Sequence, residues 1–246
     1  MRTSRALRTL AAGVAAALLV AGCSGDDGGS DGGDTSQLTA RLEAAQKHVT
    51  DAPALTISLR TSDLPDGITG LINAKGRGYQ GETAGDAAFE GDVDVVSGGS
   101  AIKAEVVATG GTVYAKTDLA PVFLTIDPKT LGAPDPAGLL GAKGEGLPVI
   151  LLETEKLSDE GKSRDGKDVL TTIQGTLPGD VVSTFLPSAD PRGSFAVKYR
   201  LTDDDVLRDA TISGPFYPGA DDVTYVVQLA ASDDDSTIEP PSKTRR

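Results

Sequence analysis

The stretch "AAFEGDVDVVSGGSAIKAEVVATGGTVYAKTD", residues 87–118, decides the fold. Apolar and polar residues alternate in three short runs, which predicts strands near 87–96, 101–108 and 112–117. The runs are joined by Ser97-Gly98-Gly99-Ser100 and by Gly110-Gly111, and tight hairpin turns need glycine where φ is positive. The stretch therefore predicts an antiparallel meander with one solvent-exposed face.

The same alternation recurs on both sides of this meander. Further strands are predicted at 54–62, 155–162, 167–176, 194–202, 206–214 and 222–231. Two apolar segments, 146–154 and 178–187, have short helical character, and four prolines make 120–140 a long connection. The sum is an α+β chain of antiparallel strands with about three helices.

One longer helix is predicted before the first strand, over Ser36–Asp51. Its apolar residues recur every three or four positions, which is the period of a helical stripe. They are Leu38, Leu42, Ala45 and Val49. Ser36 is the expected N-cap, and Pro53 closes the element.

The N-terminus has the pattern of a secretory signal. Three arginines precede an apolar run at 11–20, which is too short to span a bilayer. Val20-Ala21-Gly22-Cys23 then matches the bacterial lipobox, so we expect cleavage after residue 22 and acylation of Cys23. The alternative is a buried free thiol beside an ordinary cleavage site. The predicted parts are a lipoprotein signal peptide (1–22), the acylated cysteine with a flexible acidic tether (23–36), one folded domain (37–232) and a disordered C-terminal tail (233–246).

Composition limits the partners and the core. The formal net charge of −13 disfavours binding to nucleic acid and to anionic headgroups. With one cysteine, which the lipobox assigns to the anchor, no disulfide is expected. The chain has no Trp and only 4% aromatic residues, so the core must consist mainly of Val, Leu, Ile and Ala.

No motif predicts catalysis, a metal or a cofactor. The only histidine, His48, lies on the predicted helix, and the sequence has no HExxH motif or cysteine pair for zinc. Gly76-x-Gly78-x-x-Gly81 has the letters of a dinucleotide turn but lacks a βαβ unit around it. The acidic runs 203–205 and 233–235 lack the ligand spacing of a calcium loop. We expect a protein that is not an enzyme.

The balance of elements predicts a ligand cavity. About nine strands would present one apolar face, and three short helices with few aromatic residues cannot fill it. The alternative is that side chains and helices pack the sheet solidly. The inward positions of the alternation give the candidate cavity residues, for each of which ordinary core packing is the other interpretation: Ile57, Leu59, Val93, Val95, Val106, Val113, Ile173 and Val197.

Several ordered blocks, with the lipobox before them, carry a family resemblance. They are "GGTVYAKTD", "FLTIDPKTLGAPDPAGLL", "RDGKDVLTTIQGTLPGDVV" and "PSADPRGSFAVKYRLTDDDVLRDATISGPFYPGADDVTYVVQL". From about Cys23 to Leu229 the chain resembles the LppX/LprAFG family of actinobacterial lipoproteins, most closely its LprG branch. The acidity of the chain and its glycine-rich segment 70–86 depart from some relatives.

The resemblance implies a fold and a function. The fold is a strongly curved antiparallel half-barrel with helices packed on its concave face, enclosing a hydrophobic cavity near whose portal Val93 falls. The function is that of a carrier, a monomer lipid-anchored through Cys23 on the extracytoplasmic face of the cell membrane. It would hold acyl chains of triacylated glycolipids or triacylglycerol and act beside a major-facilitator exporter. The alternative is an interaction module that binds an exporter or a cell-wall assembly factor through the same apolar face.

Overall fold

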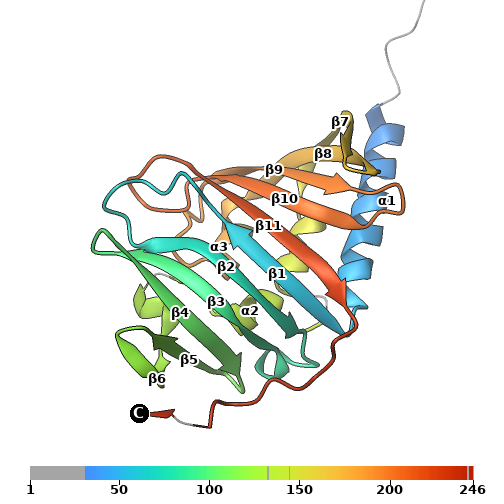
Figure 1. Cartoon of the computed structure of the whole chain (residues 1–246). Coiled ribbons are helices and arrows are strands. Elements are labelled where there is room, and N and C mark those ends of the chain that lie inside the picture. Colours follow the sequence, from blue (N-terminus) through green and yellow to red (C-terminus); the bar gives the residue numbers. More distant parts are fainter. Residues whose placement is uncertain (1–30, 132, 144, 243, 246) are drawn as a thin grey trace, which may run out of the picture. The chain divides into compact units, whose positions relative to one another are not determined.

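Twelve strands form one sheet in the part of the chain described by this computed structural model, residues 31–131, 133–143, 145–242 and 244–245 (Figure 1). The strands are β1 (Ala54–Arg60), β2 (Gly70–Tyr79), β3 (Ala88–Ser97), β4 (Ser100–Thr109), β5 (Thr112–Thr117), β6 (Ala120–Ile126), β7 (Glu155–Asp165), β8 (Asp168–Pro178), β9 (Ser194–Leu201), β10 (Leu207–Gly214), β11 (Val223–Ser232) and β12 (Thr244–Arg245). Their order is β12-β6-β5-β4-β3-β2-β1-β11-β10-β9-β8-β7. All neighbours are antiparallel except β12, which runs parallel to β6, and the sheet is not closed.

The meander β3–β5 forms as the sequence predicts. Gly98 and Gly99 have φ values of 58° and 77°, and Gly110 and Gly111 have φ values of 58° and 69°. These left-handed conformations suit glycine and close both tight turns. β1 and β7–β11 also lie where alternation predicts them, with ends that differ by up to three residues.

Three strands were not predicted: β2, β6 and the two-residue β12, which lies in the expected tail. β2 contains Gly70, Gly76 and Gly78, which remove the alternation signal. The close packing of Phe89 requires one of them, because a Cβ on Gly76 would lie 2.6 Å from the ring of Phe89. β6 lies in the segment 120–140, which its prolines predicted to be a connection. The pairing of β6 with β5 outweighs the tendency of proline to interrupt a strand.

Helix α1 (Asp31–Thr50) carries the predicted apolar stripe, and all four stripe residues are buried. It begins five residues before the expected start, so the N-cap assignment of Ser36 is wrong and residues 31–36, expected in the tether, are helical. Asp34 lies in its first turn, where a carboxylate interacts favourably with the helix dipole. The predicted signal peptide 1–22 and Cys23 lie outside the described residues.

The remaining helices are short. They are the α-helices α2 (Pro136–Leu140) and α3 (Gly179–Phe185) and the 3-10 helices η1 (Ala84–Asp86), η2 (Pro128–Leu131) and η3 (Leu147–Leu151). η3 and α3 confirm the two predicted helical segments. α2 was not predicted; its N-cap Asp135 accepts the N–H of Ala137 at 3.0 Å.

The segment after β11 packs against the sheet. Ile238 is 2% exposed and contacts Ala88 and Val107, and its carbonyl accepts a hydrogen bond from the Thr109 hydroxyl. Arg77 Nη1 also donates to the carbonyl of Ser236 at 2.9 Å. These contacts differ from the expectation of a disordered tail from residue 233 on, because Ile238 finds an apolar site on strands β3 and β4.

Candidate functional site

An apolar pocket in the described part of the chain, here called the main pocket, has a volume of about 270 Å³. Strands β1–β6 form one wall, and the segment from residue 128 to 147, which includes α2, forms the other. Its lining consists of Ile57, Leu59, Thr69, Leu71, Ala74, Phe89, Val93, Val95, Ser97, Ile102, Ala104, Val106, Val113, Ala115, Thr117, Ile126, Pro128, Ala133, Pro134, Pro136, Leu139 and Leu147. None of these lining residues carries a charge, so the pocket suits an apolar ligand.

Three hydroxyl residues mark one end of the main pocket, here called the hairpin end. Thr69 directly precedes β2 and is exposed. Ser97 ends β3 at its turn into β4, and Thr117 ends β5 at its turn into β6. The opposite part of the pocket is lined by buried apolar residues such as Phe89 and Val113. The pocket is therefore polar only where the chain turns.

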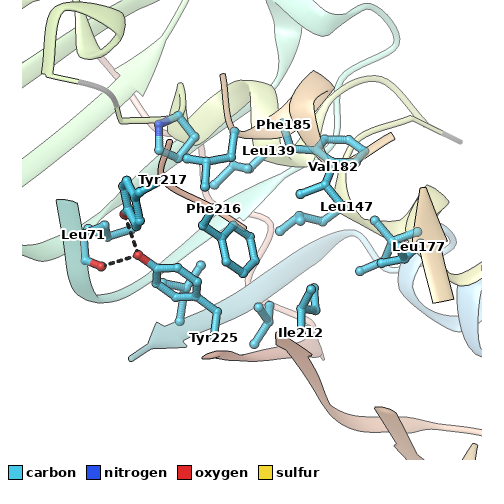
Figure 2. A pocket seen from close by; sticks show the side chains of 15 residues that line it. Leu71, Leu139, Leu147, Leu177, Val182, Phe185, Ile212, Phe216, Tyr217 and Tyr225 are labelled. Atoms are coloured by element: carbon cyan, nitrogen blue, oxygen red, sulfur yellow. Dashed lines mark hydrogen bonds between the residues drawn. The ribbon is translucent and has the colours of Figure 1, made fainter. Parts of the chain in front are cut away.

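A second apolar space of about 70 Å³, here called the side pocket, adjoins the first. The two share Leu59, Leu71, Pro134, Leu139 and Leu147. Val182 and Phe185 of α3 line the side pocket together with Phe216, Tyr217 and Tyr225 (Figure 2). Movement of the shared side chains would join the two spaces.

A pair of tyrosine hydroxyls forms the polar feature of the side pocket. Tyr225 Oη donates to the carbonyl of Leu71 at 2.7 Å and lies 2.7 Å from Tyr217 Oη (Figure 2). Because the single proton of Tyr225 is used on Leu71, Tyr217 is the donor between the two hydroxyls. Burial raises the pKa of both phenols, so both stay neutral near pH 7. The pair links Tyr225 of β11 and Tyr217 to Leu71 of β2 by hydrogen bonds.

Six of the eight predicted cavity residues come together in the main pocket: Ile57, Leu59, Val93, Val95, Val106 and Val113. Ile173 and Val197 do not line either pocket. Both are buried, as alternation predicts, in a cluster with the aromatic rings of Phe195 and Tyr199. Their burial agrees with the alternative interpretation of ordinary core packing, and ligand contact by Ile173 and Val197 stays a prediction. Whether the other six contact a ligand stays a prediction.

Sequence reasoning missed the covering wall of the main pocket. Pro128, Ala133, Pro134, Pro136 and Leu139 lie in the segment that prolines identify only as a connection. It also missed the tyrosine pair, because Tyr217 lies between strands and follows no period. A cluster of prolines beside a wide sheet was the one available signal for the covering wall.

Other candidate sites of the sequence have structural explanations. Gly76 and Gly78 lie in β2, which is antiparallel to both neighbours, so they do not form a dinucleotide turn. The N–H and carbonyl of Gly81 pair with the backbone of Gly141 and Lys143. His48 is exposed on α1. Within the described ranges, no three His, Cys, Asp or Glu residues gather as a metal site, and no helix has the length and apolar character to cross a membrane.

Comparison with known proteins gives the family and the fold. The family model described as LppX_LprAFG lipoprotein matches residues 34–240. The structure is similar to that of LprF from Mycobacterium bovis, with a TM-score of 0.66 and 14% identity over 84% of this chain and 97% of that chain. It is also similar to the Mycobacterium tuberculosis lipoprotein LppX, with a TM-score of 0.56 and 14% identity over 83% of this chain and 99% of that chain. No curated protein matches the chain.

Proposed function

The chain belongs to the LppX_LprAFG lipoprotein family, and on this premise we propose that it is a carrier that holds lipid acyl chains in the main pocket. The observation that supports the proposal most directly is the lining of that pocket, which is aliphatic and aromatic apart from three hydroxyl residues at the hairpin end. An acyl chain would lie among the apolar side chains. A polar glycerol or sugar headgroup would lie at the hairpin end.

Partition supplies the driving force for this function. Each buried CH₂ is worth about 0.8 kcal/mol, so burial of a long chain offsets much of the cost of its removal from a bilayer. No covalent step is needed, and we propose no enzymatic activity. The ligand class is a triacylated glycolipid or triacylglycerol.

The proposed cavity is larger than the main pocket alone. Ligand pockets usually measure about 300–1,000 Å³, and the main pocket has about 270 Å³. We propose that an entering chain displaces Leu59, Leu139 and Leu147 and thereby joins the side pocket to the main one. The curved sheet and helices α2, α3 and η3 would then enclose one hydrophobic cavity, with Ile57, Val93, Val95, Val106 and Val113 in contact with the chain.

The proposed location follows from Cys23. Acylation there would hold a monomer on the extracytoplasmic face of the cell membrane, where a carrier moves lipid toward the cell envelope. Stable attachment needs two or more acyl chains. An exporter of the major-facilitator type is the proposed partner for delivery, and no nucleic acid partner is proposed.

Native mass spectrometry of the purified, non-acylated protein tests the carrier function. Val93→Trp places an indole in the main pocket and is expected to remove co-purifying lipid without changing the far-ultraviolet dichroism. Val206→Trp is the matched control, because Val206 is exposed in the turn between β9 and β10. Unchanged lipid loading in Val93→Trp would refute the assignment of the pocket. Absence of lipid from the unsubstituted protein, made in a host that contains such glycolipids, would favour the interaction module instead.

A further inference from the structure

The turn of the β5–β6 hairpin exposes an apolar strip. Leu119 is 90% exposed, the largest value among the exposed large apolar side chains of the described residues. Val122, on the same hairpin, is 36% exposed, and Pro121 between them is exposed too. The other exposed side chains of this kind, Leu152 and Val206, lie on separate elements. The strip Leu119–Val122 is therefore more than a scattered surface residue.

This tip is coupled to the main pocket through Thr117. The Thr117 hydroxyl accepts the N–H of Ala120 at 3.1 Å, which closes the turn around Asp118 and Leu119. Thr117 also lines the main pocket and forms part of its hairpin end. Thr117 therefore belongs both to the turn and to the wall of the pocket.

We propose that Leu119 inserts into a lipid bilayer and turns the hairpin end of the main pocket toward the membrane. A protein partner would need about 800 Å² of matching surface on each side, which a two-residue turn does not offer. A bilayer adapts to a single projecting side chain, and leucine gains free energy when it leaves water.

The inference rests on the proposed function in one respect, the acyl anchor on Cys23. Asp31 follows Cys23 by eight chain steps, so the chain length limits Asp31 to about 29 Å from the anchored cysteine. A molecule held at one point can rotate freely over the surface. A second contact at Leu119 would fix which end of the pocket faces the lipid.

Charge selects the membrane surface. Asp118 is exposed beside Leu119, and the whole chain carries a net charge of −13. Anionic headgroups would repel this tip, whereas zwitterionic ones would not. We therefore expect contact with phosphatidylcholine vesicles and weaker contact when phosphatidylglycerol is added.

The test uses the full chain with Cys23→Ser, which removes the only cysteine. An environment-sensitive fluorophore is attached at Asp118→Cys, and a matched probe is attached at Asp204→Cys in the turn between β9 and β10. With phosphatidylcholine vesicles, the probe at 118 is expected to shift to the blue and to resist an aqueous quencher, while the probe at 204 does not. Leu119→Ser is expected to weaken the contact about tenfold or more, and Val206→Ser is expected to leave it unchanged. All variants keep residues 1–22, so any contribution of that apolar run is common to them.

Equal responses of the two probes, no response at 118, or a response that Leu119→Ser leaves intact would each overturn the inference. The outcome is separable from that of the carrier function. Leu119→Ser is expected to keep lipid that it acquired during expression, seen by native mass spectrometry, but to exchange it with vesicles about tenfold more slowly. A response at 118 in a protein that never holds lipid would support membrane contact and refute the carrier.

Discussion

The two halves of the sheet fill their inward faces differently. In the half β7–β11, Phe195, Tyr199 and Tyr225 are buried, and Phe216 packs edge-on against Phe195 with ring centroids 4.8 Å apart. In the half β1–β6 the residues that line the pocket are mostly valine, alanine, leucine and isoleucine, with Phe89 as the aromatic exception. The half β1–β6, here called the hollow half, therefore borders the larger space of about 270 Å³, whereas the half β7–β11, here called the solid half, borders only the side pocket of about 70 Å³.

The outer face of the hollow half shows where its other aromatic residues lie. Tyr79, Tyr114 and Phe123 pack against the cluster of Ala88, Val107 and Ile238. Each ring points away from the pocket. The chain has ten aromatic residues. Of those in β2–β6, only Phe89 lines the main pocket.

The largest predicted effect contrasts two buried phenylalanines. Phe195→Ala is expected to lower the free energy of unfolding by about 3–5 kcal/mol, because the lost ring leaves a closed void beside Phe216. Phe89→Ala is expected to cost at least about 1 kcal/mol less, because its ring borders a pocket that already lacks contacts on that side. Urea unfolding of both variants measures the difference. Equal losses would show that the main pocket is filled in solution.

Alternation identifies the inward face of a strand but not what lies opposite. Val93, Val106, Ile173 and Val197 follow the same period, and the structure buries all four at least in part. Only the first two meet open space, because the aromatic rings that fill the other half come from several strands and from the loop after β10. Which inward residue lines a pocket therefore depends on contacts that no single strand contains.

Strands β2 and β6 and the start of α1 were missed because glycine or proline interrupts the sequence pattern there. The close packing of Phe89 requires Gly76 in β2, and β6 contains Pro121, so neither strand shows its pairing in its own sequence. The start of α1 was misjudged because Gly32 and Gly33 are poor helix formers, and the acidic residues around them were taken as a tether. The family resemblance gave correctly a mostly antiparallel, open sheet with few helices, since it depends on ordered blocks rather than on one period.

Gly76→Ala is expected to have an intermediate effect. The added Cβ would lie 2.6 Å from the ring of Phe89, which lines the main pocket, and 2.2 Å from the carbonyl of Glu90, so the ring and the β3 backbone must shift. We expect a loss of about 1–3 kcal/mol in the free energy of unfolding, together with reduced lipid loading in native mass spectrometry. Gly98→Ala is the control for the glycine change alone, since nothing lies near its Cβ and only its positive φ opposes the substitution. A Gly76→Ala variant with normal loading would show that Phe89 does not limit the pocket.

The smallest predicted effect concerns a contact that joins the two halves. Asp63, in the connection from β1 to β2, accepts the N–H of Thr224 in β11 at 3.0 and 3.1 Å and the hydroxyl of Thr61 at 2.6 Å. Burial alone would raise the pKa of Asp63, but these hydrogen bonds outweigh it and lower the pKa. A carboxyl whose pKa is lower in the folded state stabilises the fold above its unfolded pKa of about 4 and loses that contribution as the pH falls through the folded pKa.

Asp63→Asn keeps the shape of the side chain and removes its charge. Because Asp63 is exposed, we expect the variant to be less stable by no more than about 1 kcal/mol at pH 6, with a smaller difference at pH 3, where the wild-type carboxylate is partly protonated. Urea midpoints at the two pH values measure this. A difference that stays constant with pH would assign the contribution to the geometry of the side chain rather than to its charge.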